Sequence, residues 1–344
     1  MEFAFTEDQV AITEAAREML IETTTAADLR KQLESGEARD SARWDTIREM
    51  GLLGLLAPES AGGLGMGLTD LIGIAEAAGY VGLPEPLVET AGVAVPLLAA
   101  IGDEGRLAAV LDGATVAIGY PGRAFVADAD TAAFLLLSHG DELHLVDAKD
   151  VQLTRQPSFD PFRRLFSVEW TPSDATRQSV GWADAKDRGA VLAAAQLIGL
   201  GQRCINLAVA YAKERTQFGK PIGSYQAVKH QIATAQVQVE FARPVVHAAA
   251  AELSLGTLPA LARVSHAKIA AGEAADLAAR TSVQVHGAMG MTWEVDLHVF
   301  LKRAMALRTD WGTPAEHRAR VLDRITRLPT GTDRTFASEM AIGA

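Results

Sequence analysis

Apolar residues recur every three or four positions from Glu7 to Thr24, the period of a helix that buries one face. Thr6 and Gln9 are spaced as a capping box at the start of this segment. Three further helices are predicted over residues 41–50, 68–78 and 90–101. The first third of the chain is therefore expected to be helical.

The period of the hydrophobic pattern changes between residues 114 and 172. FLLLSH and ELHLVD flank Gly140 and Asp141, the pattern of a β-hairpin. ATVAIGY and RLFSVEW indicate two more short strands. This stretch predicts a small β-domain.

Long helical patterns return after Asp184. They cover residues 189–215, 224–253, 258–287 and 294–308, and short Gly/Pro turns separate them. The predicted fold is mainly α with a small β-domain, and its last part is a four-helix bundle. The expected parts are a helical domain (1–112), a reduced β-domain (113–178), the bundle (179–330) and a tail (331–344).

Composition is typical of a globular protein: 49% of the 344 residues are hydrophobic and 22% are charged. The net charge of -11 argues against nucleic acid or an anionic membrane as the partner. Cys204 is the only cysteine, which excludes a disulfide within the chain and favours a reducing compartment. The N-terminus has no secretory pattern, and polar residues interrupt the apolar run 189–212. We expect a cytoplasmic protein with no membrane span.

Candidate chemistry gathers in two stretches of the predicted bundle. In ERTQFGKPIGSYQ, Arg215 can pair with a diphosphate, Phe218 can lie against a planar heterocycle, and Gln226 can bond to a ring edge. In QVHGAMGMTWE, Gln284 comes shortly before Gly287, which lets a backbone approach a ligand closely. The residues of the first stretch meet the needs of a dinucleotide. The loop PESAGGLGMG lacks a P-loop lysine and is interpreted as a structural turn, and no metal-ligand spacing is found.

These two motifs, in this order and about sixty residues apart, resemble those of the acyl-CoA dehydrogenases, as does PESAGGLGMG. The resemblance implies a non-covalent FAD, an acyl-CoA substrate and an electron-transfer flavoprotein as electron acceptor. In that family a carboxylate removes the α-proton while the flavin takes hydride from the β-carbon. Family FAD sites are shared between subunits, which implies that Arg215, Phe218, Gln226, Gln284 and Gly287 contact the FAD of a partner.

The sequence lacks the family residues with which a subunit completes its own active site. No T-E-x-x-x-G-S-D segment occurs between Gly113 and Pro172. In the Y-E-G-T base motif, Trp311 stands at the glutamate position and Asp310 falls one residue early, about 100° away if the helix continues. Some members place the base just before the first bundle helix, at an E-R pair, where this chain has Asp187 and Arg188.

The retained residues are those that serve a partner's flavin, and the missing ones would complete a site in this chain. We therefore expect an α2β2 assembly with a paralogous subunit, similar to the degenerate subunits of actinobacterial steroid-degrading acyl-CoA dehydrogenases, acting on a steroid-derived acyl-CoA. Two alternatives stay open. One is a self-sufficient homo-oligomer with Asp187 or Asp310 as base, and the other is a flavin-free structural subunit.

Overall fold

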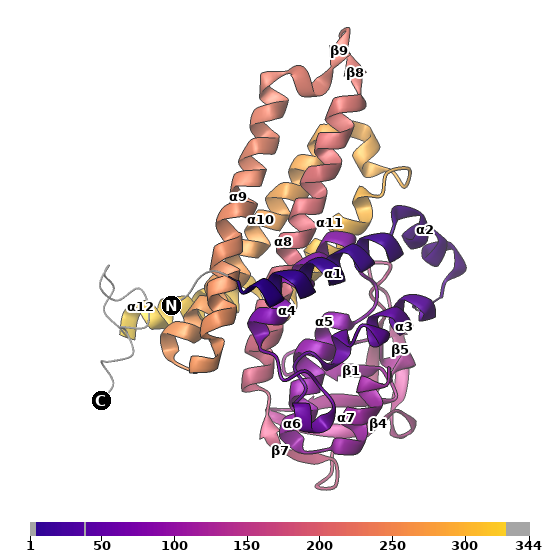
Figure 1. The fold of residues 1–344 in the computed structure, drawn as a ribbon, viewed down its shortest axis with the longest axis vertical. Coiled ribbons are helices and arrows are strands. Elements are labelled where there is room, and N and C mark those ends of the chain that lie inside the picture. The colour runs from indigo at the N-terminus through magenta and orange to yellow at the C-terminus, as the bar shows by residue number, and fades with distance from the viewer. Residues whose placement is uncertain (1–4, 38, 328–344) are drawn as a thin grey trace.

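The computed structural model describes residues 5–37 and 39–327 and shows an N-terminal group of helices, two small sheets and a long helical bundle (Figure 1). Thr6 and Gln9 form the predicted capping box. The helix predicted over 90–101 begins earlier, at Leu87, and contains a π-helical turn. The N-terminal helices are α1 (Glu7–Thr23), α2 (Ala26–Ser35), α3 (Ser41–Glu49), α4 (Leu68–Val81), α5 (Leu87–Glu89), α6 (Val95–Ile101) and α7 (Glu104–Leu111).

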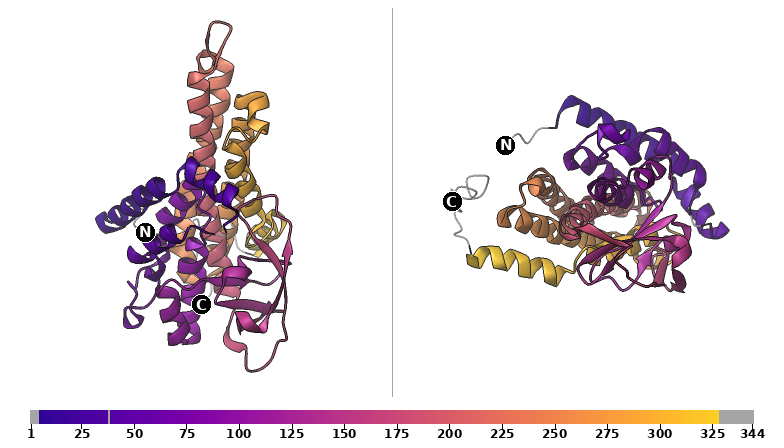
Figure 2. Two further views of the ribbon diagram at one scale, coloured as in Figure 1. Left: turned by 90° about the vertical axis from the view of Figure 1, so that its right-hand side faces the viewer. Right: turned by 90° about the horizontal axis from the view of Figure 1, so that it is seen from below.

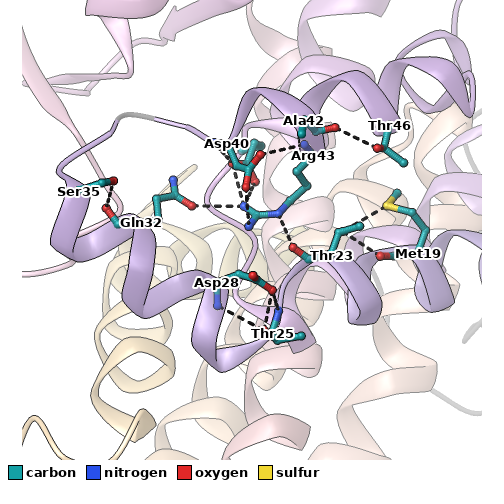
Figure 3. Close-up of polar contacts among 11 residues, drawn as sticks. Met19, Thr23, Thr25, Asp28, Gln32, Ser35, Asp40, Ala42, Arg43 and Thr46 are labelled. Atoms are coloured by element: carbon teal, nitrogen blue, oxygen red, sulfur yellow. Dashed lines mark hydrogen bonds and ion pairs between the residues drawn. The ribbon is translucent and has the colours of Figure 1, made fainter.

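A buried arginine holds the first three helices together. Arg43 of α3 donates to the carbonyl of Thr23 at 2.9 Å and to the side chain of Gln32 at 3.3 Å (Figure 3). It also forms an ion pair with the buried Glu85 at 2.8 Å. Because the charge is paired and hydrogen-bonded, its burial is tolerated.

The β-domain contains a four-stranded and a three-stranded sheet, in the orders β1-β3-β4-β7 and β2-β6-β5. The predicted hairpin around Gly140 is confirmed, with Phe134 opposite Asp147 and His139 opposite Glu142. The strands are β1 (Val116–Gly119), β2 (Val126–Ala127), β3 (Phe134–His139), β4 (Glu142–Asp147), β5 (Gln152–Gln156), β6 (Leu165–Glu169) and β7 (Arg177–Gly181). Only β1 and β3 pair in parallel within these two sheets.

The bundle is built around one long central helix. Its members are α8 (Ala183–Glu214), α9 (Gln226–Glu252), α10 (Leu258–His286), α11 (Leu297–Thr309) and α12 (Pro314–Arg327). By length and composition α8 could cross a membrane, but 78% of its most apolar window is buried inside the protein, so it is a core helix. The sequence predicts the first four members. The fifth, α12, was not predicted and extends sideways from the base of the bundle (Figure 2).

The glycine-rich loop is a structural turn, as predicted. Its backbone N–H groups are used within the fold, since Gly65 donates to Ala57 at 2.8 Å and Met66 donates to Leu55 at 2.9 Å. A side chain at Gly63 would collide with Ala57. The predicted tail, residues 331–344, lies outside the described residues.

Candidate functional site

Trp311, at the predicted base position, is a buried packing residue. It follows α11 in a left-handed conformation (φ 57°), and its side chain is packed into the interior, with the residue 5% exposed. Its ring stacks on Tyr120 with centroids 4.1 Å apart and planes 17° apart. The other side of the ring lies against Gly189 of α8, where a Cβ atom would overlap the indole. Trp311 thus fills the space between the β-domain and the bundle.

Asp310 is held by three donors. The hydroxyl of Tyr120 donates to its carboxylate at 2.6 Å, and Arg123 forms an ion pair with it at 2.7 Å. Arg163 contacts the other carboxylate oxygen. Burial and the adjacent Asp310 raise the pKa of Tyr120, which therefore remains a donor. These contacts occupy the carboxylate oxygens that a catalytic base would need free.

Asp187 faces α12 and is also engaged. Its carboxylate forms an ion pair with Arg320. Burial raises the pKa of Asp187, and the contact with Arg320 opposes that rise. Asp187 is not among the residues that line the cavity beside Trp311. The structure therefore separates the two candidate bases, and neither points an unpaired carboxylate into that cavity.

The cavity beside Trp311 is small, and both charged and apolar side chains line it. Its volume is about 90 Å³, whereas ligand pockets typically have roughly 300–1,000 Å³. Glu89 lines it and accepts a hydrogen bond from Gln196 at 3.2 Å. Burial raises the pKa of Glu89. Glu89 was not predicted as a site residue, although a single acidic residue in the apolar run LVETAGVAV was a signal for it.

The predicted cofactor residues lie at the opposite end of α8. Arg215 follows the last residue of α8, and a hairpin of β8 (Thr216–Gln217) and β9 (Lys220–Pro221) comes directly after it. The turn residues Phe218 and Gly219 have φ values of 54° and 81°, and Phe218 is 91% exposed. Such a conformation is costly for an aromatic residue. The hairpin therefore presents an exposed ring on a strained backbone turn.

Gln226, Gln284 and Gly287 are brought to the same end of the bundle. Gln226 is the first residue of α9, and Gln284 lies in the last turn of α10. Gly287 ends α10 with φ 61° and has open space where a side chain would be. A small apolar cluster joins the three helix ends; it consists of Ala208, Ala212 and Val285, with Tyr211, Ile222, Val228 and Ile232 packed around it.

His286 supports this end of the bundle rather than binding a ligand. Its ring stacks on Tyr211 with centroids 4.3 Å apart, and its Nδ1 lies 2.8 Å from the carbonyl oxygen of Ser282. The five predicted cofactor residues, in contrast, are all exposed. Beside Gln284 a groove of about 570 Å³ runs between α9 and α10.

The predicted base position at Trp311 and the predicted cofactor residues around Arg215 are far apart in this chain. At about 1.5 Å per residue, the helix from Gly189 to Arg215 spans roughly 40 Å. The exposed end therefore cannot serve a cofactor whose reactive ring would lie beside Trp311. Arg215 forms no ion pair within the described residues, so its guanidinium is available to an anion. An unpaired arginine, an exposed aromatic ring and an accessible glycine backbone suit the diphosphate end of a dinucleotide.

Comparison with known proteins identifies the architecture. Two family profiles match: "Acyl-CoA dehydrogenase, N-terminal domain" over residues 6–114 and "Acyl-CoA dehydrogenase, C-terminal domain" over residues 184–326. Acyl-CoA dehydrogenase IpdE2 of Mycolicibacterium smegmatis is 35% identical over 314 residues, covering 89% of this chain and 97% of the relative. Acyl-CoA dehydrogenase FadE34 of Mycobacterium tuberculosis is 33% identical over 340 residues, covering 93% of this chain and 47% of the relative.

Solved structures agree with this fold. The ChsE4-ChsE5 complex from Mycobacterium tuberculosis contains a chain with a TM-score of 0.85 and 24% identity, and the match covers 96% of this chain and 100% of that one. A chain of the Tcur3481-Tcur3483 steroid ACAD G363A variant has a TM-score of 0.81 and 25% identity, with 93% and 98% covered. The predicted helical, β and helical architecture is confirmed.

Proposed function

Because this chain belongs to the acyl-CoA dehydrogenase family, we propose that it is the subunit that completes a partner's FAD site and supplies no catalytic base. The assembly would dehydrogenate a steroid-derived acyl-CoA between its α and β carbons. Two similar structures support this proposal: the ChsE4-ChsE5 complex and the Tcur3481-Tcur3483 steroid ACAD are each named as a pair of unlike chains.

The observation that carries the proposal is the packing of Trp311. A catalytic glutamate must reach the substrate's α-carbon through an open cleft. In this chain the corresponding residue is buried against Gly189 and stacked on Tyr120. The cavity that remains beside Trp311, about 90 Å³, is much smaller than the roughly 300–1,000 Å³ of a typical ligand pocket.

The exposed end of the bundle supplies binding and orientation. Arg215 would pair with the diphosphate, and the hairpin would place Phe218 against the cofactor. Gln226 and Gln284 would bond to polar edges, and Gly287 would let the backbone approach closely. When bound, the flavin accepts a hydride from the substrate. The base that removes the α-proton would belong to the paralogous subunit, and an electron-transfer flavoprotein would accept the electrons.

The test is to purify the chain alone and together with a co-expressed paralogous subunit, and to measure flavin absorbance and native mass. We expect no flavin on the chain alone and about one FAD per pair of unlike chains. A yellow homo-oligomer with one FAD per chain would contradict the proposal and favour Asp187 or Asp310 as base.

The second part of the test concerns Arg215. Arg215→Ala should weaken FAD binding by the co-purified assembly roughly tenfold, the effect of losing one charge-assisted hydrogen bond, so its flavin content should fall when free FAD is held near the dissociation constant of the unaltered assembly. Arg318→Ala is the matched control, because Arg318 is an exposed arginine on α12 that pairs with the exposed Glu273. An Arg215→Ala assembly with full flavin content would favour a purely structural role for this chain.

A further inference from the structure

A separate cleft lies at the base of the bundle, where the N-terminal helices meet α8 and the end of α9. Its volume is about 520 Å³. The walls carry polar and apolar surface in about equal measure, and their larger apolar side chains are half-buried, so these remain partly exposed to the cleft. They include Leu56, Met66, Leu68, Pro96 and Leu253.

Arg188 and Asp184, both on α8, line the cleft together with these apolar side chains. Arg188 follows Asp187 on α8, and consecutive helical side chains point about 100° apart. Asp187 therefore pairs with Arg320 of α12, while Arg188 lines the cleft. Within residues 5–37 and 39–327, no carboxylate lies within ion-pair distance of Arg188, and this includes Asp184 one turn earlier.

Arg188 is half-buried and has no ion-pair partner among the described residues. Burial lowers the pKa of its guanidinium, and the nearby negative charge of Asp184 opposes that fall. A half-buried charge without a counter-ion destabilises a fold, and an anion in contact with it relieves that penalty. The planar guanidinium matches a carboxylate, which can accept two parallel hydrogen bonds.

We propose that this cleft binds an amphiphilic carboxylate, such as a medium-chain fatty acid, with its head on Arg188 and its hydrocarbon tail along the apolar side chains. A small anion would leave the apolar side chains of the cleft in contact with water. A neutral hydrocarbon would leave Arg188 unpaired. The proposal does not depend on the flavin site, because the cleft shares no lining residue with the Trp311 cavity or with the exposed end of the bundle.

The test is calorimetric titration of the full chain with octanoate, octanol and acetate. Octanoate should bind, and octanol and acetate should each bind at least about tenfold more weakly, because each lacks one half of the interaction. Arg188→Met should weaken octanoate binding about tenfold or more, and Arg188→Lys should weaken it less. Arg318→Met, an exposed control on α12, should leave it unchanged.

Several results would overturn the proposal. The first is that the unaltered chain does not bind octanoate, and the second is that Arg188→Met binds it equally well. The third is that Trp311→Phe loses octanoate binding, which would place the ligand in the other cavity. Without ligand, Arg188→Met should unfold at the same or a higher urea concentration, since it removes an unpaired charge. A clear loss of stability would mean that Arg188 has a partner in the fold, against the premise. If Arg188→Met does not fold, Arg188→Lys decides the question through its weaker octanoate binding.

Discussion

Replacing Trp311 with glutamate restores the residue type of the family's base motif. We expect the change to destabilise the chain without creating a self-sufficient dehydrogenase. Trp311 is packed against Gly189 and stacked on Tyr120. Truncating a buried tryptophan costs roughly 3–5 kcal/mol, a large share of the ~5–15 kcal/mol that stabilises a typical fold.

The introduced carboxylate adds a second cost. It would lie beside Asp310, whose oxygens are already bound to Tyr120, Arg123 and Arg163. Two buried carboxylates repel each other, so one must bind a proton or draw in water. The free energy of unfolding should therefore fall by at least ~3 kcal/mol in Trp311→Glu.

The assay is urea unfolding followed by far-ultraviolet circular dichroism, because indole fluorescence changes with the substitution itself. Trp311→Phe is the matched control; it keeps an aromatic ring on Tyr120 and should lose only about 1 kcal/mol. The reasoning fails if Trp311→Glu is as stable as the unaltered chain. It fails equally if that variant purifies alone as a yellow protein that reduces an electron acceptor with an acyl-CoA.

Two further predictions concern stability. Gly189→Val should unfold several degrees below the unaltered chain in a thermal scan, because any Cβ atom at Gly189 overlaps the Trp311 ring, and a midpoint equal to the parent would contradict this packing. Burial raises the pKa of Asp128 from 3.8 to about 6, so the folded chain holds a proton that the unfolded chain has released, and the contribution of this group to stability falls as the pH rises from about 4 to about 6. Asparagine suits the left-handed backbone at this position (φ 55°). Asp128→Asn should therefore abolish the part of the pH-dependent fall in the free energy of unfolding that Asp128 causes, about 1–3 kcal/mol. Urea unfolding of the two proteins across this pH range measures the difference, and parallel pH profiles would refute the prediction.

The elements that the sequence predicts well are those with local signals. The helix after Thr6 and the hairpin at Gly140 were found from periodicity, capping and turn residues within a few positions. The helix α12 was missed although it carries the same kind of signal. Thr313 and Glu316 form a capping box around Pro314, where the backbone N–H of Glu316 lies 3.3 Å from the Thr313 hydroxyl.

The surroundings of the candidate bases could not be predicted in the same way. The sequence locates Trp311 and Asp310, but Tyr120, which contacts both, is about 190 positions away. No local period connects a residue after strand β1 with the end of α11. Only the packing of the β-domain against the bundle brings them together, so the engagement of Asp310 became apparent from the structure alone.

Filling the space beside Trp311 explains how this chain could fold without a cofactor. An empty pocket large enough for a flavin would leave apolar walls without contacts, and such cavities are strongly destabilising. Here the stacked rings of Trp311 and Tyr120, fixed by the N–H of Trp311 donating to the Tyr120 hydroxyl at 2.7 Å, occupy that space. The exposed end of the bundle needs no such filling, because it lies on the surface. A chain built in this way can be stable on its own and still present Arg215 and Phe218 to a partner, which is the arrangement that the proposed function requires.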